Sequence, residues 1–152
     1  MAIVNLSSWK EENNMNKSTN RELMGYAEEI LKDKECLLRN KHGKFFESYN
    51  GQISALGVSV LMIGLKATLA IYYQDFDSVG EYKKKAYRRA VLEVIVKMLN
   101  KKNNTTYAAA EEFVHEVMGN EDFAKEQQWK TDIINCSVAL KQVIRTYEMV
   151  KS

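Results

Sequence analysis

The sequence contains no proline in 152 residues, although proline usually makes up about 5% of a protein. Because proline breaks helix interiors, its absence favours long helices. No segment alternates polar and apolar residues for long enough to predict a strand. Hydrophobic residues make up 45% of the chain and charged residues 28%, which is typical of a folded globular protein. We therefore expect an all-α fold, a compact bundle of about five to six helices around a central apolar helix.

The central helix is predicted between Phe45 and Tyr73, where Lys66 is the only charged residue after Tyr49. Apolar residues recur there at helical spacing along two stripes, and a helix that is apolar all round is expected to be buried. The first stripe is Ile53, Leu56, Val60, Ile63, Ala67 and Ile71, and the second is Val58, Leu61, Leu65, Leu69 and Tyr72.

The same segment has two further features. Gly57 and Gly64 lie seven residues apart, near enough to one face for a neighbouring helix to approach closely. The stretch also has about the 20-residue length of a membrane span. Lys66 near its middle, with Ser59 and Thr68 close by, disfavours that alternative because a central Lys costs about 3 kcal/mol in a bilayer.

The rest of the chain is predicted to form a flexible arm over residues 1–18 and a single helical-bundle domain over residues 19–152. Capping boxes at 19–22 and 78–81, a Thr cap at 106 and breaks rich in Gly or Asn indicate the helix boundaries. The helices expected around the central one are 19–40, 78–100, 106–119 and a last helix from 120 onward.

Basic residues are concentrated in residues 79–102, which carry eight Lys or Arg against two Glu, a net charge of +6. On a helix, Lys84 would stack on Arg88 and Lys85 on Arg89, and such like-charge pairs favour an anionic partner. Lys and Arg supply sequence-independent contacts to phosphate backbones. Changing these four residues to Glu is therefore expected to weaken binding to a polyanion such as RNA without unfolding the protein. An ordinary solvated charged face remains the alternative.

Residues suited to catalysis are few. The only histidines are His42 and His115, and neither lies in a recognisable nucleophile motif. Glu112 and His115 have the Glu-x-x-His spacing of di-iron bundle sites, but such a site needs this motif twice. No Gly-rich phosphate loop occurs. We expect a protein that is not an enzyme and that needs no cofactor or metal, with a di-metal bundle enzyme as the alternative.

The cysteines and the N-terminus indicate a cellular location. Cys36 and Cys136 share no metal-ligand spacing and are expected to be buried, reduced side chains. The first residues lack the basic start and apolar run of a secretory signal. The sequence therefore predicts a cytoplasmic protein that does not enter a membrane.

Three segments carry a resemblance: YNGQISALG at 49–57, IGLKATLAIYY at 63–73 and ALKQVIRTY at 139–147. They resemble the small all-helical subunit of the type III-B CRISPR Cmr complex. In that family an aromatic-led helix reaches a Gly-Leu pair and continues as an Ala-rich apolar stretch that ends in aromatic residues. The similarity extends over residues 20–150.

This resemblance implies a non-catalytic subunit that is present in several copies beside other Cmr subunits and borders the channel that holds CRISPR RNA and its target. Contacts to the RNA backbone would then come from basic side chains. The candidates are Lys66, Lys83, Lys84, Lys85, Arg88, Arg89, Lys141 and Arg145. The alternatives are the small subunit of a type III-A complex and a helical protein-interaction adaptor with a basic patch.

Overall fold

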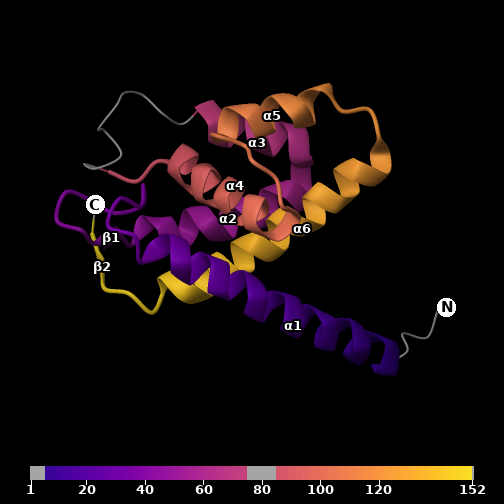
Figure 1. The fold of residues 1–152 in the computed structure, drawn as a ribbon, viewed down its shortest axis with the longest axis horizontal. Helices are drawn as coiled ribbons and strands as arrows, with labels where there is room; N and C mark the ends of the chain where they lie inside the picture. Colours follow the sequence, from indigo (N-terminus) through magenta and orange to yellow (C-terminus); the bar gives the residue numbers. More distant parts are fainter. Residues whose placement is uncertain (1–5, 75–84, 152) are drawn as a thin grey trace.

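The computed structural model describes residues 6–74 and 85–151, with side chains from residue 17 onward. These residues form six helices and two strands of two residues each, so the predicted all-α fold is confirmed (Figure 1). The elements are α1 (Leu6–Leu31), β1 (Phe45–Phe46), α2 (Ser48–Ile63), α3 (Leu65–Gln74), α4 (Arg88–Asn103), α5 (Ala110–Gly119), α6 (Phe123–Ile144) and β2 (Met149–Val150).

Helix α1 starts well before the predicted capping box at 19–22. Its C-terminal half packs against α6 and α4, where Leu23, Ala27 and Leu31 are fully buried. Its N-terminal part extends away from the other helices (Figure 1). The predicted boundary between residues 1–18 and 19–152 therefore falls inside a continuous helix.

Helix α4 is the central helix of the bundle, and it packs against each of the other five helices. This differs from the expectation that residues 45–73 form the centre. The polar side of α4 also has a structural role, because the Glu93 carboxylate accepts a hydrogen bond from the Ala110 backbone N–H at 3.0 Å and so caps the start of α5. The buried side chains of α4 are Ala90, Val91, Leu92, Val94, Ile95, Val96, Met98 and Leu99.

The predicted continuous helix between Phe45 and Tyr73 is wrong, because it breaks at Gly64. Gly64 has φ 93° and ψ 168°, a backbone conformation that is nearly exclusive to glycine. The Ser59 and Thr68 hydroxyls lie 2.8 Å apart, and the Tyr72 hydroxyl donates to the Gln52 carbonyl at 2.6 Å. These contacts pair α2 and α3 in antiparallel order, so the segment is a helical hairpin joined by one residue.

The break also changes which apolar stripe is buried, so the prediction that this segment is buried on all sides is wrong. Before Gly64 the first stripe faces the core, apart from Ile63, and the second faces solvent, whereas after Gly64 the order reverses. The buried residues are Ile53, Leu56, Val60, Leu65, Leu69 and Tyr72, and the exposed ones are Val58, Leu61, Ile63, Ala67 and Ile71.

Among the described residues, none of the helices has both the length and the apolar character that crossing a membrane requires.

Helix α4 begins at Arg88, later than the predicted start at 78–81. Residues 85–87 are not helical, and Tyr87 has an extended backbone with φ −122° and ψ 136°. The predicted helical stacking of Lys85 on Arg89 is therefore wrong. Lys83 and Lys84 lie outside the described residues, as does the predicted capping box.

The last two helices lie close to their predicted positions. Helix α5 ends at Gly119 as expected, although it begins at Ala110 rather than after a Thr cap at 106. Helix α6 begins at Phe123 after Asp122, whose carboxylate accepts a hydrogen bond from the Lys125 backbone N–H. This is the usual role of an Asp at an N-cap.

The chain beyond α6 returns to the start of α2, which the helical pattern did not predict. Strand β2 pairs with β1 in parallel, and the Glu47 N–H donates to the Val150 carbonyl at 2.7 Å. Arg39 lies beneath this pairing, with its guanidinium 4.6 Å from the centre of the Phe45 ring. It donates hydrogen bonds to the carbonyls of Leu31 and Gly43, so one side chain holds the turn between α1 and β1.

Candidate functional site

Three of the predicted RNA contacts come together around the start of α4. The Arg89 guanidinium lies 4.2 Å from the centre of the Tyr73 ring, and the Arg88 guanidinium lies 5.9 Å from that of Tyr72. The Lys85 amino group lies 5.0 Å from the Tyr87 ring centre. Each cation is within the roughly 6 Å at which an aromatic face attracts it, so the tyrosines help to position the three charges.

The tyrosines are themselves anchored in the fold. The Tyr72 and Tyr87 side chains are only 2% and 5% exposed, and the Tyr49 hydroxyl accepts a hydrogen bond from the Tyr87 backbone N–H at 3.3 Å. Buried rings cannot stack on a nucleic-acid base as exposed aromatic residues do in single-strand binding proteins. The surface formed by Lys85, Arg88 and Arg89, called the α4 cation cluster below, therefore offers charge rather than stacking.

The α4 cation cluster lies at the positive end of a helix. A helix N-terminus carries about half a positive charge, and its first turn usually favours Asp or Glu. In α4 the first turn contains no acidic residue and begins with Arg88 and Arg89. Tyr87 occupies the N-cap position, where Ser, Thr, Asp or Asn is preferred. This arrangement places three cations beside the positive end of a helix, and helix N-termini are known to bind anions.

The other predicted RNA contacts lie elsewhere. Lys66 is half-buried, and its amino group donates to the Asn120 carbonyl at 3.0 Å, next to the end of α5. Lys141 donates to the Ser54 hydroxyl between α6 and α2, and Arg145 directly follows α6. Helix α2 packs on α3 with one side and on α6 with another. The α4 cation cluster lies beside α3, whereas Lys141 and Arg145 lie at the end of α6, so the two sets of cations are separate.

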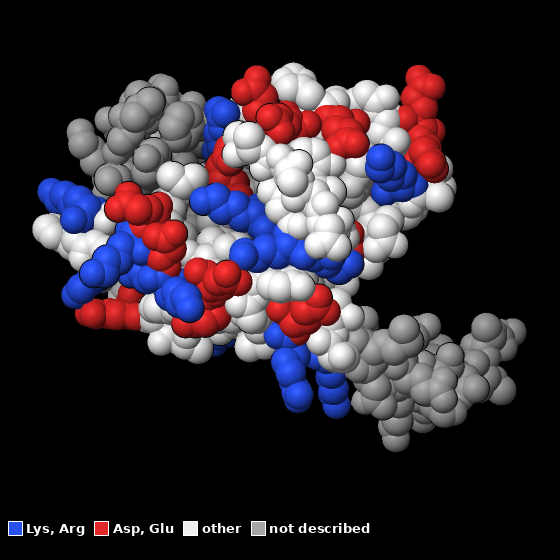
Figure 2. Space-filling view, viewed as in Figure 1, with Lys and Arg blue, Asp and Glu red and all other residues white. Residues whose placement is uncertain are grey.

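The surface charges are mixed on the face shown in Figure 2, where Lys and Arg alternate with Asp and Glu over much of the area. Two of the basic residues at the end of α4 form ion pairs, Lys101 with Glu29 at 3.1 Å and Lys102 with Asp132 at 3.2 Å. Their pairing makes them structural contacts of α4 with α1 and α6.

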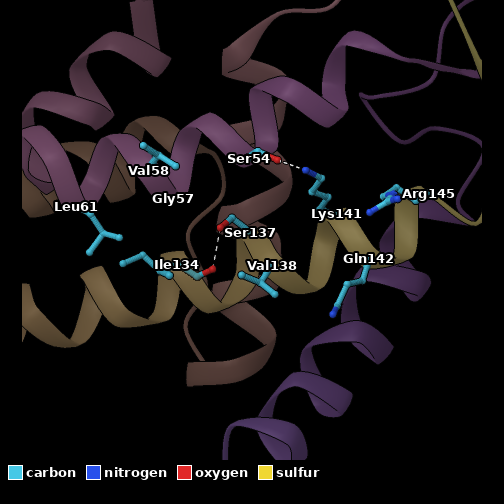
Figure 3. Close-up of a pocket in the computed structure, with 10 residues that line it drawn as sticks. All are labelled: Ser54, Gly57, Val58, Leu61, Ile134, Ser137, Val138, Lys141, Gln142 and Arg145. Carbon is cyan, nitrogen blue, oxygen red and sulfur yellow. Dashed lines mark hydrogen bonds between the residues drawn. The ribbon is translucent and has the colours of Figure 1, made fainter. Parts of the chain in front are cut away.

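A groove with a volume of about 390 Å³ lies between α2 and α6 (Figure 3). Small side chains of Ser54, Gly57 and Ser137 bring the two helices together, and a Cβ atom added at Gly57 would lie 3.1 Å from the Ser137 hydroxyl. The predicted close helix approach therefore occurs at Gly57. It does not occur at Gly64, where an added Cβ meets no atom within 4 Å. The other lining residues are Val58, Leu61, Ile134, Val138, Lys141, Gln142 and Arg145.

Neither histidine lies in a cluster of metal ligands. Among the described residues there is no group of three or more His, Cys, Asp or Glu side chains that could hold a metal ion. His115 is exposed on α5, with its Nε2 atom 3.9 Å from the Glu111 carboxylate and its ring edge-on to Tyr73. The Glu112 carboxylate instead accepts a hydrogen bond from the Ala108 backbone N–H at 2.9 Å, so it stabilises the start of α5.

Both cysteines are buried and unpaired, as the sequence predicts. Burial raises the pKa of the Cys136 thiol to about 12 and raises the pKa of the Cys36 thiol as well. Since the thiolate is the reactive form, both side chains are held in their unreactive state at neutral pH.

The groove was not predicted from the sequence, although the sequence contained a signal for it. Val58 and Leu61 lie on the stripe that we expected to be buried, yet the structure exposes 59% and 65% of these side chains. The glycine at 64, directly before a second apolar run, was the sign that the two runs belong to different helices.

No protein-family model, curated protein or solved structure matches this chain.

Proposed function

We propose that this chain is a non-catalytic subunit of a multi-subunit RNA-guided complex, of the type III-B kind that its sequence resembles, and that it contacts the RNA backbone. The observation that carries the RNA contact is the α4 cation cluster. Lys85, Arg88 and Arg89 surround the positive end of a helix that lacks acidic residues in its first turn. Other subunits of the complex, CRISPR RNA and target RNA are its partners under this proposal, in the cytoplasm.

The chemistry of the α4 cation cluster favours phosphate. The planar Arg fork matches phosphate oxygens, and a helix N-terminus attracts the same groups. Because the neighbouring tyrosines are buried or covered by Arg89, the cluster offers no free aromatic face on which a base could stack. Binding should therefore depend on salt and differ little between RNA sequences.

The test compares the wild type with a variant that carries Lys85→Glu, Arg88→Glu and Arg89→Glu. Retention of a labelled single-stranded RNA is measured against salt concentration, for the chain alone and together with large subunits of a type III-B complex. Each lost phosphate contact lowers the salt slope by about 0.7, so loss of all three should lower it by about 2. Circular dichroism and thermal melting show whether the variant is folded.

A charge-matched control carries Lys17→Glu, Arg21→Glu and Lys32→Glu, three exposed changes on or directly after α1. This control has the same net charge as the test variant, so it should retain RNA binding if the position of the charges matters. Equal loss in both variants would indicate a general charge effect and would contradict the proposed contact. Failure to assemble with type III-B subunits, with assembly in a type III-A complex instead, would assign the chain to the alternative complex.

A further inference from the structure

Exposed large apolar side chains are concentrated in one region of the molecule. Single exposed apolar residues are normal, but clusters indicate interaction sites. Of the eight large apolar side chains that the described residues expose, four lie between positions 58 and 63 of α2. They are Val58, Leu61, Met62 and Ile63, with exposed fractions of 59%, 65%, 78% and 51%. Val138 on the facing side of α6 is 49% exposed.

The groove between α2 and α6 has a different character at its two ends (Figure 3). At one end, Val58 and Leu61 of α2 face Ile134 and Val138 of α6, and all four are apolar. At the other end lie Lys141 and Arg145, with Gln142 at the edge. The small residues Gly57 and Ser137 form the part in between.

The two cations are placed to receive a carboxylate from outside the chain. Lys141 and Arg145 are four residues apart, so they lie on one face of the C-terminal end of α6. No acidic side chain lines the groove, and within the described part of the chain neither residue forms an ion pair. The negative end of α6 stabilises these charges in part, and the Lys141 amino group, which donates one hydrogen bond to the Ser54 hydroxyl, has further N–H donors.

We propose that the groove between α2 and α6 is the docking site for an amphipathic helix of a partner protein, with its apolar side chains on Val58, Leu61 and Val138 and an Asp or Glu at the end beside Lys141 and Arg145. Helices that lie in grooves are recognised through anchors spaced along one face. This site is separate from the α4 cation cluster and does not depend on the proposed RNA contact.

A second copy of the chain is the main competing occupant. Its turn between α5 and α6 carries the acidic residues Glu121 and Asp122, and Phe123, the first residue of α6, is a large exposed apolar side chain. The α6 wall of the groove from Ile134 to Arg145 spans about 16 Å at 1.5 Å per residue, which is about three helical turns. A helix can cover this length with successive anchors, whereas a single aromatic residue beside a turn cannot.

The test selects binders to the full chain from a displayed library of helical peptides with random surface residues, so that both acidic and basic helices are available. We expect the enriched peptides to carry Asp or Glu at one end of an apolar face. Their affinity should fall at least tenfold for a Leu61→Ser and Val138→Ser variant and for an Arg145→Glu variant. Ile71→Ser is the apolar control on α3, and Lys34→Glu is the charge control.

Several outcomes would overturn the proposal. They are the absence of enrichment, enrichment of basic or uncharged helices, and equal loss of affinity in the test and control variants. Sedimentation that shows self-association, reversed by both Phe123→Ser and Val138→Ser, would assign the groove to a second copy. A loss of RNA retention in Arg145→Glu, with peptide affinity unchanged, would show that this cation serves phosphate. Because the α4 variant is tested separately on RNA, failure of one proposal does not affect the other.

Discussion

At the scale of single residues, the two glycines of the α2–α3 segment have different functions. Gly57 allows α6 to approach, since an added Cβ would lie 3.1 Å from the Ser137 hydroxyl, which itself donates to the Ile134 carbonyl at 2.7 Å. At Gly64 an added Cβ would meet no atom within 4 Å, so this glycine is needed for its backbone conformation. The sequence spacing identified both glycines but could not distinguish these two reasons.

We expect Gly64→Ala to lower the free energy of unfolding by about 1–3 kcal/mol, the usual cost of holding a residue other than glycine in such a conformation. The expected cause is backbone strain at φ 93°, because there is room for the side chain. Urea unfolding followed by circular dichroism measures the change.

The control for this prediction is Gly51→Ala, inside α2, where an added Cβ also meets no atom within 4 Å. Alanine is favoured over glycine in helices by up to about 1 kcal/mol, so this variant should be unchanged or more stable. Equal stability of the two variants would contradict the conformational role of Gly64.

At the scale of elements, the packing of α4 on α6 depends on a buried carboxylate. Asp132 on α6 is 1% exposed, and it accepts hydrogen bonds from Gln128 at 2.9 Å and Asn103 at 3.2 Å. The Lys102 amino group lies 3.2 Å from the same carboxylate. In the sequence Lys102 is part of a basic segment, and the pattern of a helix does not show which distant residue it meets.

We expect Asp132→Ala to lower the free energy of unfolding by about 2–3 kcal/mol, because the donors around Asp132 lose a charged partner inside the protein. Lys102 is partly exposed and can turn toward water, which limits the loss. Thermal melting and urea unfolding measure the effect.

Lys101→Ala provides the control, since its ion pair with Glu29 is largely exposed. Exposed pairs contribute about 1 kcal/mol or less, so this variant should remain close to the wild type. A loss at Lys101 as large as that at Asp132 would show that the burial of the carboxylate is not what matters.

At the scale of the whole molecule, the fold class followed from the missing prolines and the helical spacing, and α5 and α6 lie near their predicted ranges. The predictions failed where long-range contacts decide the structure. Strand β2 pairs with residues about a hundred positions earlier, and Arg39 joins the carbonyls around them. Gly64 turns one apolar run into two helices, which leaves the outer side of α2 exposed and creates the groove.

The candidate site was predicted in part. Lys85, Arg88 and Arg89 do lie together. Their contacts with Tyr87, Tyr72 and Tyr73 position them, rather than the expected stacking of Lys85 on Arg89 along a helix. The family resemblance grouped Lys141 and Arg145 with these cations, and the sequence could not show that the two sets lie apart. Their separation depends on which sides of α2 pack on α3 and on α6.

Several groups that are neutral in the folded protein make its stability depend on alkaline pH. Burial raises the pKa of Cys136 to about 12, and burial together with a hydrogen bond to the Glu28 carboxylate raises the pKa of Tyr147 to about 12. In the unfolded chain, Cys and Tyr lose their protons near pH 8.5 and 10, roughly. The folded state therefore holds more protons than the unfolded state above about pH 8.5, so the free energy of unfolding falls as the pH rises from there toward 12.

We expect the urea midpoint, measured with a reductant present, to be nearly constant from pH 7 to 8 and to fall between pH 8.5 and 10. In a Cys136→Ala variant the midpoint at pH 7 changes through packing, but the fall between pH 8.5 and 10 should be smaller than in the wild type. The remaining fall comes from Cys36 and Tyr147, whose pKa values are also raised in the folded protein. Lys34→Ala, an exposed change after α1, should leave the fall unchanged. An identical fall in the wild type and in Cys136→Ala would show that this thiol ionises as readily in the folded protein as in the unfolded chain, and would contradict its place in the core beside α4.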